Sequence, residues 1–240
     1  MSICIITVVK NNPIDMLETY YSIKSNLHNI KLWIIVDGNN GTSITSIMEE
    51  EIRFYDNVKI IKGLDRGLYN AMNIGASYAG DEDYLWWINA GDKLYEIPEI
   101  NFNYDLLFYK IIIKETSKIS KLDVKNLDNG KNYFPVSIFW HQGFIVKKKI
   151  FAKYLYDESL KLAADLYLMS LCQKYEQYFV SDQIICTYSI GGISNKLPIL
   201  WLKEYIKVAN KLQINIFMMP LKCYLLIIKL IIKGVILSFK

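Results

Sequence analysis

The stretch Tyr84-Leu-Trp-Trp-Ile-Asn-Ala-Gly-Asp-Lys-Leu94 joins a short apolar run directly to a polar turn that carries one carboxylate. Residues 84–88 predict a buried strand, and residues 89–92 predict the turn after it. Glycine lets a backbone approach a ligand closely, and an aspartate oxygen suits a divalent cation. Asn, Gly and Asp are also the ordinary residues of a strand-to-loop turn, so this stretch alone leaves both interpretations open.

Strands and helices alternate on the N-terminal side of this stretch. The predicted strands are at 2–9, 31–36 and 58–62, and the predicted helices between them are at 14–26, 45–54 and 68–79. This order predicts an α/β fold with a mostly parallel sheet flanked by helices. Parallel strands end at one edge of a sheet, so we expect Asp37, Asp65 and Asp92 around a single crevice there.

The charge of the chain is unevenly distributed. The net charge is +4, but residues 196–240 carry +7 and the rest of the chain carries −3. This argues against a nucleic-acid groove across the main domain and favours an anionic surface that meets the C-terminal tail. The four cysteines lack metal or redox spacing, and the N-terminus lacks the features of a signal peptide. We therefore expect a cytoplasmic protein with reduced thiols.

Four sequence motifs follow one another in a familiar order: Ile5–Asn11, Val36–Gly38, Asp65–Gly75 and Trp87–Asp92. With this order and spacing, the chain resembles a bacterial glycosyltransferase of family 2, of the surface-polysaccharide type, and the third motif is the most specific. The resemblance implies the GT-A fold and an enzyme that uses a nucleotide-sugar donor.

The resemblance also implies a division of the chain. It covers a glycosyltransferase domain at 1–195, with a nucleotide-sugar half at 1–115 and an acceptor half at 116–195. Residues 196–240 are predicted to form a basic, apolar helical tail.

The donor-site residues follow from the resemblance. Thr7, at the end of the first strand, and Asp37, after the second strand, would hold the nucleotide, which is usually uridine. Asn89 would reach the ribose. The remaining residues implied in the donor site are Asp65, Arg66, Asn73 and, more loosely, Tyr69.

The turn at 89–92 corresponds to the Asp-x-Asp element of the family. Its final acid, Asp92, would ligate Mg²⁺ or Mn²⁺ that bridges the donor diphosphate. Two residues depart from the family pattern: Asn89 replaces the first aspartate, and Asn70 stands where an aspartate is common. Both changes weaken the metal assignment, but Mg²⁺ needs only one or two carboxylates beside phosphates and water.

Two candidate catalytic residues lie in the acceptor half. His141 stands in the apolar segment Trp140–Phe144. Such a lone histidine is more often a core residue, whereas the resemblance puts it near the acceptor pocket. Asp165 falls in a helix predicted at 159–175, where it can be exposed, cap the first turn or face the site. The resemblance implies that Asp165 is the catalytic base.

The other segments of the acceptor half are less informative. Strands are predicted at 105–114 and 182–190, an irregular lysine-rich segment at 116–134, and a glycine-rich loop at 191–195. The irregular segment is either mobile and near the acceptor or a plain solvated connector. Relatives carry a similar glycine pair, so the loop is expected over the diphosphate or the acceptor.

The tail beyond Pro220 is apolar with sparse lysines. Lys222, Lys229, Lys233 and Lys240 fall on one side of a helix. The uncharged runs are too short to span a bilayer, which takes about 20 residues. An interfacial helix on the inner face of the cell membrane therefore fits the pattern, and a helix packed on the domain is the alternative.

Together these observations predict an inverting glycosyltransferase that moves a sugar from a nucleotide-diphosphate donor, UDP-sugar first, to a glycan or lipid-linked acceptor in surface polysaccharide synthesis. Asp165 would remove the acceptor proton as general base. The alternatives are a sugar nucleotidyltransferase, which the lack of a glycine-rich basic N-terminal loop disfavours, and a catalytically silent binding module at the membrane. Asn70 and Asn89 are the best support for the silent module.

Overall fold

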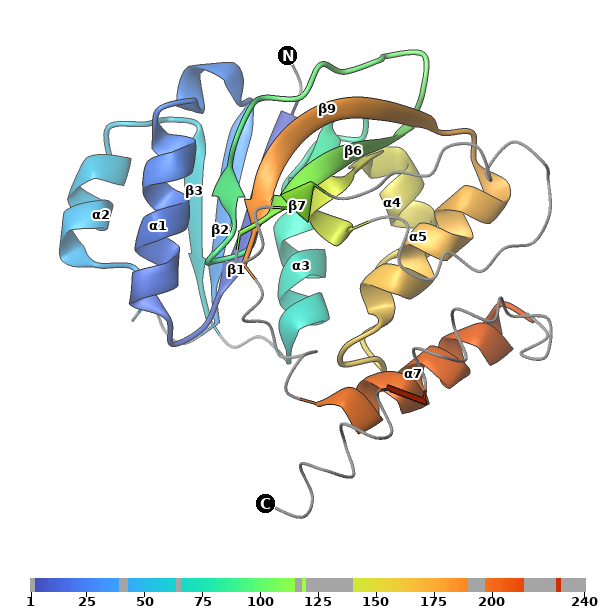
Figure 1. Cartoon of the computed structure of the whole chain (residues 1–240). Helices are drawn as coiled ribbons and strands as arrows, with labels where there is room; N and C mark the ends of the chain where they lie inside the picture. The colour runs from blue at the N-terminus through green and yellow to red at the C-terminus, as the bar shows by residue number, and fades with distance from the viewer. Residues whose placement is uncertain are drawn as a thin grey trace.

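The computed structural model describes residues 3–38, 43–63, 66–114, 118–119, 140–189, 197–213 and 228–229. Within these ranges, nine strands form one sheet in the order β3-β2-β1-β4-β8-β6-β9-β5, with β7 paired to β6 (Figure 1). The strands are β1 (Ile3–Val9), β2 (Leu32–Asp37), β3 (Val58–Lys62), β4 (Tyr84–Trp87), β5 (Lys93–Leu94), β6 (Leu106–Ile113), β7 (Lys118–Ile119), β8 (Phe144–Lys147) and β9 (Phe179–Tyr188).

The first four strands form the parallel part of the sheet. β1 pairs in parallel with β2 on one side and β4 on the other, and β2 pairs in parallel with β3. Every residue of β1 is buried, because both faces of this central strand are covered. This is why the strand is a continuous apolar run rather than an alternating one. The α/β fold predicted for this part of the chain is confirmed.

Beyond β4 the sheet changes direction. β8 runs antiparallel to both β4 and β6, β5 runs antiparallel to β9, and only β6 and β9 are parallel. The predicted fold of a sheet flanked by helices is confirmed, but the sheet is mixed: its parallel pairs are those among β1 to β4 and that of β6 with β9. β8 is a short apolar run, which is expected of a buried strand in either direction, so its sequence does not reveal whether it pairs parallel or antiparallel.

Helices cover both faces of the sheet and bury a core on each. Alternate residues of β1 supply the two cores: Ile3 and Ile5 face one, and Cys4 and Ile6 face the other. One face carries α1 (Pro13–Lys24) and α2 (Ser46–Ile52), with the short η1 (Leu27–Asn29); the other carries α3 (Leu68–Ala76), α4 (Lys148–Tyr154), α5 (Ala164–Tyr175) and α7 (Pro198–Lys211).

The helix α7 begins the predicted tail, but it packs into the core that Cys4 and Ile6 face. Its residues Tyr205, Val208 and Ala209 are buried there. The boundary at residue 195 stays a prediction. The proposed interfacial helix after Pro220 lies outside the described residues, apart from positions 228 and 229. No helix in the described part of the chain is both long and apolar enough to cross a membrane.

Two further segments differ from the sequence-based expectation. The helix predicted at 159–175 begins only at Ala164, because residues 161–163 donate their backbone N–H groups to a side chain of α7. The helix α4 follows β8 directly and had no expected counterpart. Most of the irregular segment at 116–134 and all of the glycine-rich loop at 191–195 lie outside the described residues.

Candidate functional site

The strand order of the sheet switches at the carboxyl ends of β1 and β4. The chain leaves β1 toward β2 and β3 on one side, and then returns to place β4 on the other side of β1. Open α/β sheets bind ligands at such a switch of strand order, outside the carboxyl ends of the strands. The turn at 89–92 follows β4 directly, so it stands at this point.

This turn is fixed by backbone and side-chain groups of α1 and by the chain just after β9. Gly91 has φ +97°, a backbone conformation that would be strained for a residue with a side chain. Its N–H lies 3.1 Å from the carbonyl oxygen of Asp15, and its carbonyl accepts from the Ser189 hydroxyl at 2.8 Å. The Thr19 hydroxyl donates to the carbonyl of Asp92 at 2.7 Å. The backbone around the carboxylate is therefore held in place by residues distant in sequence.

The carboxylate of Asp92 is buried, with 4% of the residue exposed. Oδ2 accepts from Nε2 of Gln142 at 3.2 Å, and Oδ1 accepts from the backbone N–H of Ser189 at 3.2 Å. Burial raises the pKa of Asp92 to about 7, although these two hydrogen bonds oppose the rise. A positive charge beside this carboxylate would therefore be stabilising.

Asn89 supplies a second oxygen at the same turn. Its Oδ1 is buried and has no hydrogen-bond partner among the described residues. Among the described residues, no three or more His, Cys, Asp or Glu side chains lie close enough together to hold a metal ion by themselves. One carboxylate and one orphaned amide oxygen fit a hard cation that takes its other ligands from donor phosphates and water.

Thr7 and Asp37, both predicted to hold the nucleotide, are fully buried. The Thr7 hydroxyl accepts from Nε1 of Trp33 at 3.0 Å, so it also serves the core. Asp37 ends β2, and its Oδ2 accepts from the backbone N–H of Ser43 at 2.9 Å, which ties down the far side of the loop after β2. Their roles toward a nucleotide stay predictions.

Arg66 and Asn73, two more predicted donor residues, both meet Glu158. The guanidinium of Arg66 is 3.3 Å from Glu158, and Nδ2 of Asn73 donates to it at 3.1 Å. Asn70 also donates to Glu158, at 3.0 Å. These hydrogen bonds, with Arg66, hold the pKa of Glu158 below its usual range. The amide at position 70 thus bonds a carboxylate that an aspartate there would repel. Asp65 lies outside the described residues.

The short helix η3 (His141–Gly143) joins the two sides of the site. Gln142 reaches Asp92, whereas Nε2 of His141 lies 2.5 Å from the hydroxyl of Tyr156. A side chain at Gly143 would place its Cβ 2.3 Å from the carbonyl oxygen of Tyr109, so only glycine lets η3 pack this closely. The two neighbouring side chains thus meet different partners, Asp92 and Tyr156, from one closely packed turn.

Asp165 lies in the first turn of α5 and is partly exposed. Its Oδ1 accepts from the Tyr69 hydroxyl at 3.0 Å and from the Leu166 N–H at 2.8 Å. Burial, together with the charge of Asp165, raises the pKa of Tyr69 and of Tyr156 well above the usual tyrosine range. Burial lowers the pKa of His141, and the charge of Asp165 opposes this. The structure thus gathers the predicted base and His141 in one cluster with two protonated tyrosines.

Several residues of this site were not singled out from the sequence. They are Gln142, Tyr156, Glu158 and Ser189, which bond Asp92, His141, Asn73 and the turn at 89–92. Each bond spans at least 15 residues of chain, so no local pattern marks it. Of these four residues, only Gln142 is the direct neighbour of a residue identified from the sequence, His141.

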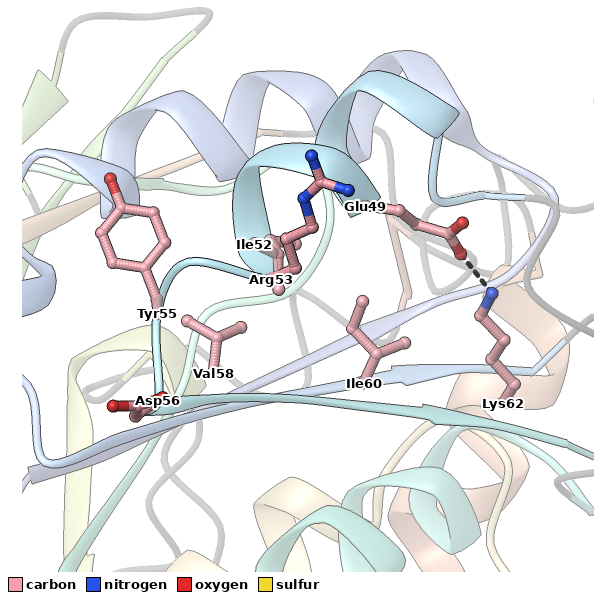
Figure 2. Close-up of a pocket in the computed structure, with 8 residues that line it drawn as sticks. All are labelled: Glu49, Ile52, Arg53, Tyr55, Asp56, Val58, Ile60 and Lys62. Atoms are coloured by element: carbon pink, nitrogen blue, oxygen red, sulfur yellow. Dashed lines mark hydrogen bonds and ion pairs between the residues drawn. The ribbon is translucent and has the colours of Figure 1, made fainter.

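A hollow lies elsewhere on the molecule, between α2 and the outer strand β3 (Figure 2). Its apolar floor includes Ile52, Val58 and Ile60, and the pair formed by Glu49 and Lys62 closes one end. None of the predicted site residues lines it. The candidate site therefore rests on the turn after β4 and on the cluster around Asp165.

The fold is shared with solved glycosyltransferase structures. TarS residues 1–349 of S. aureus match with a TM-score of 0.60 at 14% identity, covering 88% of this chain and 66% of that one. The mannosyltransferase PcManGT of Pyrobaculum calidifontis, solved with GDP-Man and Mn²⁺, matches at 0.61 and 13%, covering 88% and 63%. GalNAc-T7, solved with UDP, GalNAc and Mn²⁺, matches at 0.56 and 15%, covering 87% and 48%.

The chain thus spans two thirds or less of the length of these structures. No curated protein sequence matches it. The model of glycosyl transferase family 2 matches residues 4–95, a range that runs from the second residue of β1 to just past β5 and includes the turn at 89–92. Residues 4–95 therefore resemble glycosyl transferase family 2, and the chain that carries them has the GT-A fold.

Proposed function

We propose that the protein is an inverting glycosyltransferase that moves a sugar from a nucleoside-diphosphate donor, UDP-sugar first, to a hydroxyl of a glycan or lipid-linked acceptor. The observation that carries the proposal is the position of η3. Its consecutive residues Gln142 and His141 contact Asp92 on one side and the cluster of Asp165 on the other. Two carboxylates joined by one turn suit a single reaction centre.

Asp165 is proposed as the general base. Both of its hydrogen bonds within the described residues go to Oδ1, so Oδ2 is the oxygen assigned to the acceptor proton. As the acceptor oxygen attacks the anomeric carbon, the proton passes to Oδ2 and the bond to the diphosphate breaks. A single displacement of this kind inverts the anomeric configuration, through an oxocarbenium-like transition state.

The turn at 89–92 is proposed to meet the leaving diphosphate. Asp92 and Asn89 would hold Mg²⁺ or Mn²⁺, which when bound offsets charge on the diphosphate. Support comes from the raised pKa of Asp92 and the orphaned Oδ1 of Asn89. Thr7, Asp37, Arg66, Asn73 and Asp65 remain the proposed contacts for the rest of the donor.

His141 is proposed to act through Tyr156. Its ring is buried and its pKa is lowered, so it is neutral at pH 7. A neutral ring can share one proton with the Tyr156 hydroxyl at 2.5 Å. This pair sits in the field of Asp165 and is proposed to fix the wall of the acceptor side.

The test uses the purified full chain with Mn²⁺ and a panel of UDP-glucose, UDP-galactose, UDP-N-acetylglucosamine and GDP-mannose. At least one donor should raise the Tm and release its nucleoside diphosphate. Stabilisation without release or transfer would favour the silent binding module. Release of pyrophosphate from a nucleoside triphosphate and a sugar phosphate would favour the nucleotidyltransferase. No response to any nucleotide would refute the donor site.

The cellular location is proposed from the sequence of the tail. The lysine stripe after Pro220 favours a peripheral position on the inner face of the cell membrane, in surface polysaccharide synthesis. Sedimentation of the full chain with anionic vesicles, but not with neutral ones, is the expected result. Failure to sediment with either would contradict the interfacial helix.

A further inference from the structure

The segment 155–163 joins α4 to α5 and is bonded by α7, which lies below α5 in the view of Figure 1. Glu204 of α7 accepts three backbone N–H groups: that of Lys161 at 2.8 Å on Oε1, and those of Leu162 at 2.7 Å and Ala163 at 3.1 Å on Oε2. Glu204 is 7% exposed. A buried carboxylate with three N–H donors is a strong and directional anchor, because hydrogen bonds to charged groups exceed neutral ones.

Other contacts along α7 support the same segment. Lys211 pairs with Asp157, and Nζ of Lys207 lies 3.4 Å from the Ser159 hydroxyl. Burial raises the pKa of Asp157, but the bonds from Lys211 and Ser159 outweigh it and bring the pKa to about 2. Three residues of one helix, spaced so that they share a face, therefore grip the segment.

Glu204 also lies at the point where α5 begins. Ala163 is the residue before the first turn of α5, and its own side chain offers no cap. Residues 161 and 162 precede the helix, and the N–H of Ala163 belongs to the N-terminal groups that lack a partner inside it. Glu204, from another helix, accepts from all three at the end where the helix dipole favours an anion. Asp165 follows two residues later, so the start of α5 sets where its carboxylate stands relative to Tyr69.

We propose that Glu204 is a positioning residue for the reaction: it fixes residues 161–163 and thereby aims the carboxylate of Asp165 at the acceptor hydroxyl. This inference rests on the proposed function, because it assigns no chemistry to Glu204 itself. An orientation error of about 1 Å at a reacting group can cost roughly 100-fold in rate. The proposed diphosphate contact at Asp92 is bonded by Gln142 and Ser189 rather than by residues 161–163, so donor binding should change little.

The test compares Glu204→Gln with Glu204→Asp in the full chain. Glutamine keeps the size of the side chain but turns an NH₂ group toward backbone N–H donors, whereas aspartate keeps the charge and shortens the reach. We expect Glu204→Gln to lower kcat about 10- to 100-fold. Its KM for the donor should stay within about twofold of the wild type, and Glu204→Asp should retain part of kcat. Lys203→Ala, an exposed neighbour on α7, is the matched control and should keep full activity.

Amide hydrogen exchange gives a second measurement. In Glu204→Gln the amides of residues 161–163 should exchange faster, while those of β1 keep their protection. Unchanged kcat in Glu204→Gln, or a loss of UDP binding in proportion to kcat, would overturn the inference. If Glu204→Gln does not fold, kcat, UDP binding and the amide exchange of residues 161–163 are compared between Glu204→Asp and the wild type instead.

The proposed function and this inference fail in different ways. A wild-type chain that neither binds nor turns over any donor of the panel refutes the function. A wild-type chain that turns over, with Asp165→Asn inactive and Glu204→Gln fully active, refutes only the positioning role.

Discussion

The turn after β4 and the start of α5 each present one carboxylate to the candidate site, but with different surroundings. Asp92 is buried with two hydrogen bonds, its pKa is about 7, and the neighbouring Asn89 Oδ1 lacks a partner among the described residues. Asp165 is partly exposed at a helix start, where Tyr69 and the Leu166 N–H donate to it. On the proposed donor side a bound cation would compensate the buried carboxylate, whereas on the proposed base side the chain itself supplies the hydrogen bonds to Asp165.

The two carboxylates should therefore affect different properties of the protein. A buried carboxylate that needs a counter-charge makes folding less favourable until a ligand supplies it. A base that is oriented before the acceptor arrives loses little on binding and gains in rate. Changes at Asp165 should therefore act on turnover, and changes at Asp92 on donor binding and on stability.

The largest effect is expected from Asp165→Asn. The amide keeps the shape and accepts from Tyr69, but it cannot take the acceptor proton. We expect kcat to fall about 10²- to 10⁴-fold, the usual range for a lost general base. The affinity for UDP with Mn²⁺, measured by calorimetry, should stay close to the wild type.

The control for this variant is Asp182→Asn, an exposed acid on β9 that pairs with Lys110. It should leave kcat unchanged, since exposed ion pairs contribute little. Full turnover by Asp165→Asn would show that another group is the base, and the contrast with Asp92 would then be lost.

The N-terminal half of the molecule was predictable from sequence because β1, β2 and β4 are buried on both faces. Such strands appear as apolar runs that end in a polar turn, so these three strands and the turn at 89–92 stand out, whereas the outer strand β3 is a shorter run between lysines. A parallel sheet brings the carboxyl ends of its strands to one edge. The position of Asp92 therefore followed from local pattern and one rule of topology.

The base side was not predictable in the same way. The bond of Tyr69 to Asp165 joins residues 96 positions apart, and Glu204 meets backbone groups 41–43 positions away. A backbone N–H carries no sequence signature, so nothing marked Glu204 as more than the lone acid of a basic tail. The same contacts delay the start of α5 beyond the periodic pattern that predicted it. Asp165 itself was identified only through the family resemblance.

Asp92→Asn should give the next largest effect, on the donor side alone. It removes the charge that a cation would meet, and interactions with charged groups are worth about 1.5–3 kcal/mol. This corresponds to roughly 10- to 100-fold weaker binding of UDP in Mn²⁺, measured by calorimetry. Equal affinity of variant and wild type would remove Asp92 from the donor site.

The pH dependence of stability separates the two carboxylates further. The pKa of Asp92 in the folded chain, about 7, lies above the value of about 4 for an unfolded aspartate. Between these values the folded chain holds more protons, so the free energy of unfolding should fall as the pH rises from about 4 to 7. The expected slope is up to about 1.4 kcal/mol per pH unit. Chemical denaturation in EDTA should show it in the wild type and not in Asp92→Asn.

The smallest effect is expected where the two sides meet, at Glu158. This carboxylate belongs to the segment before α5 but bonds Asn70, Asn73 and Arg66 of the donor half. An anionic donor that uses Arg66 would compete with Glu158 for it. Glu158→Gln keeps an acceptor for the two asparagines and removes the competing charge. Because Arg66 is 81% exposed, the gain should not exceed about 1 kcal/mol, or about fivefold tighter UDP binding.

The matched control is Asp157→Asn, one residue earlier, whose carboxylate faces Lys211 of α7 instead of Arg66. It should leave UDP binding unchanged. A gain with Glu158→Gln that disappears in the Arg66→Ala background would show that donor and segment 155–163 compete for the same guanidinium. Weaker UDP binding by Glu158→Gln would mean that Glu158 holds Arg66 in place for the donor, and the two sides would then be cooperative at this contact.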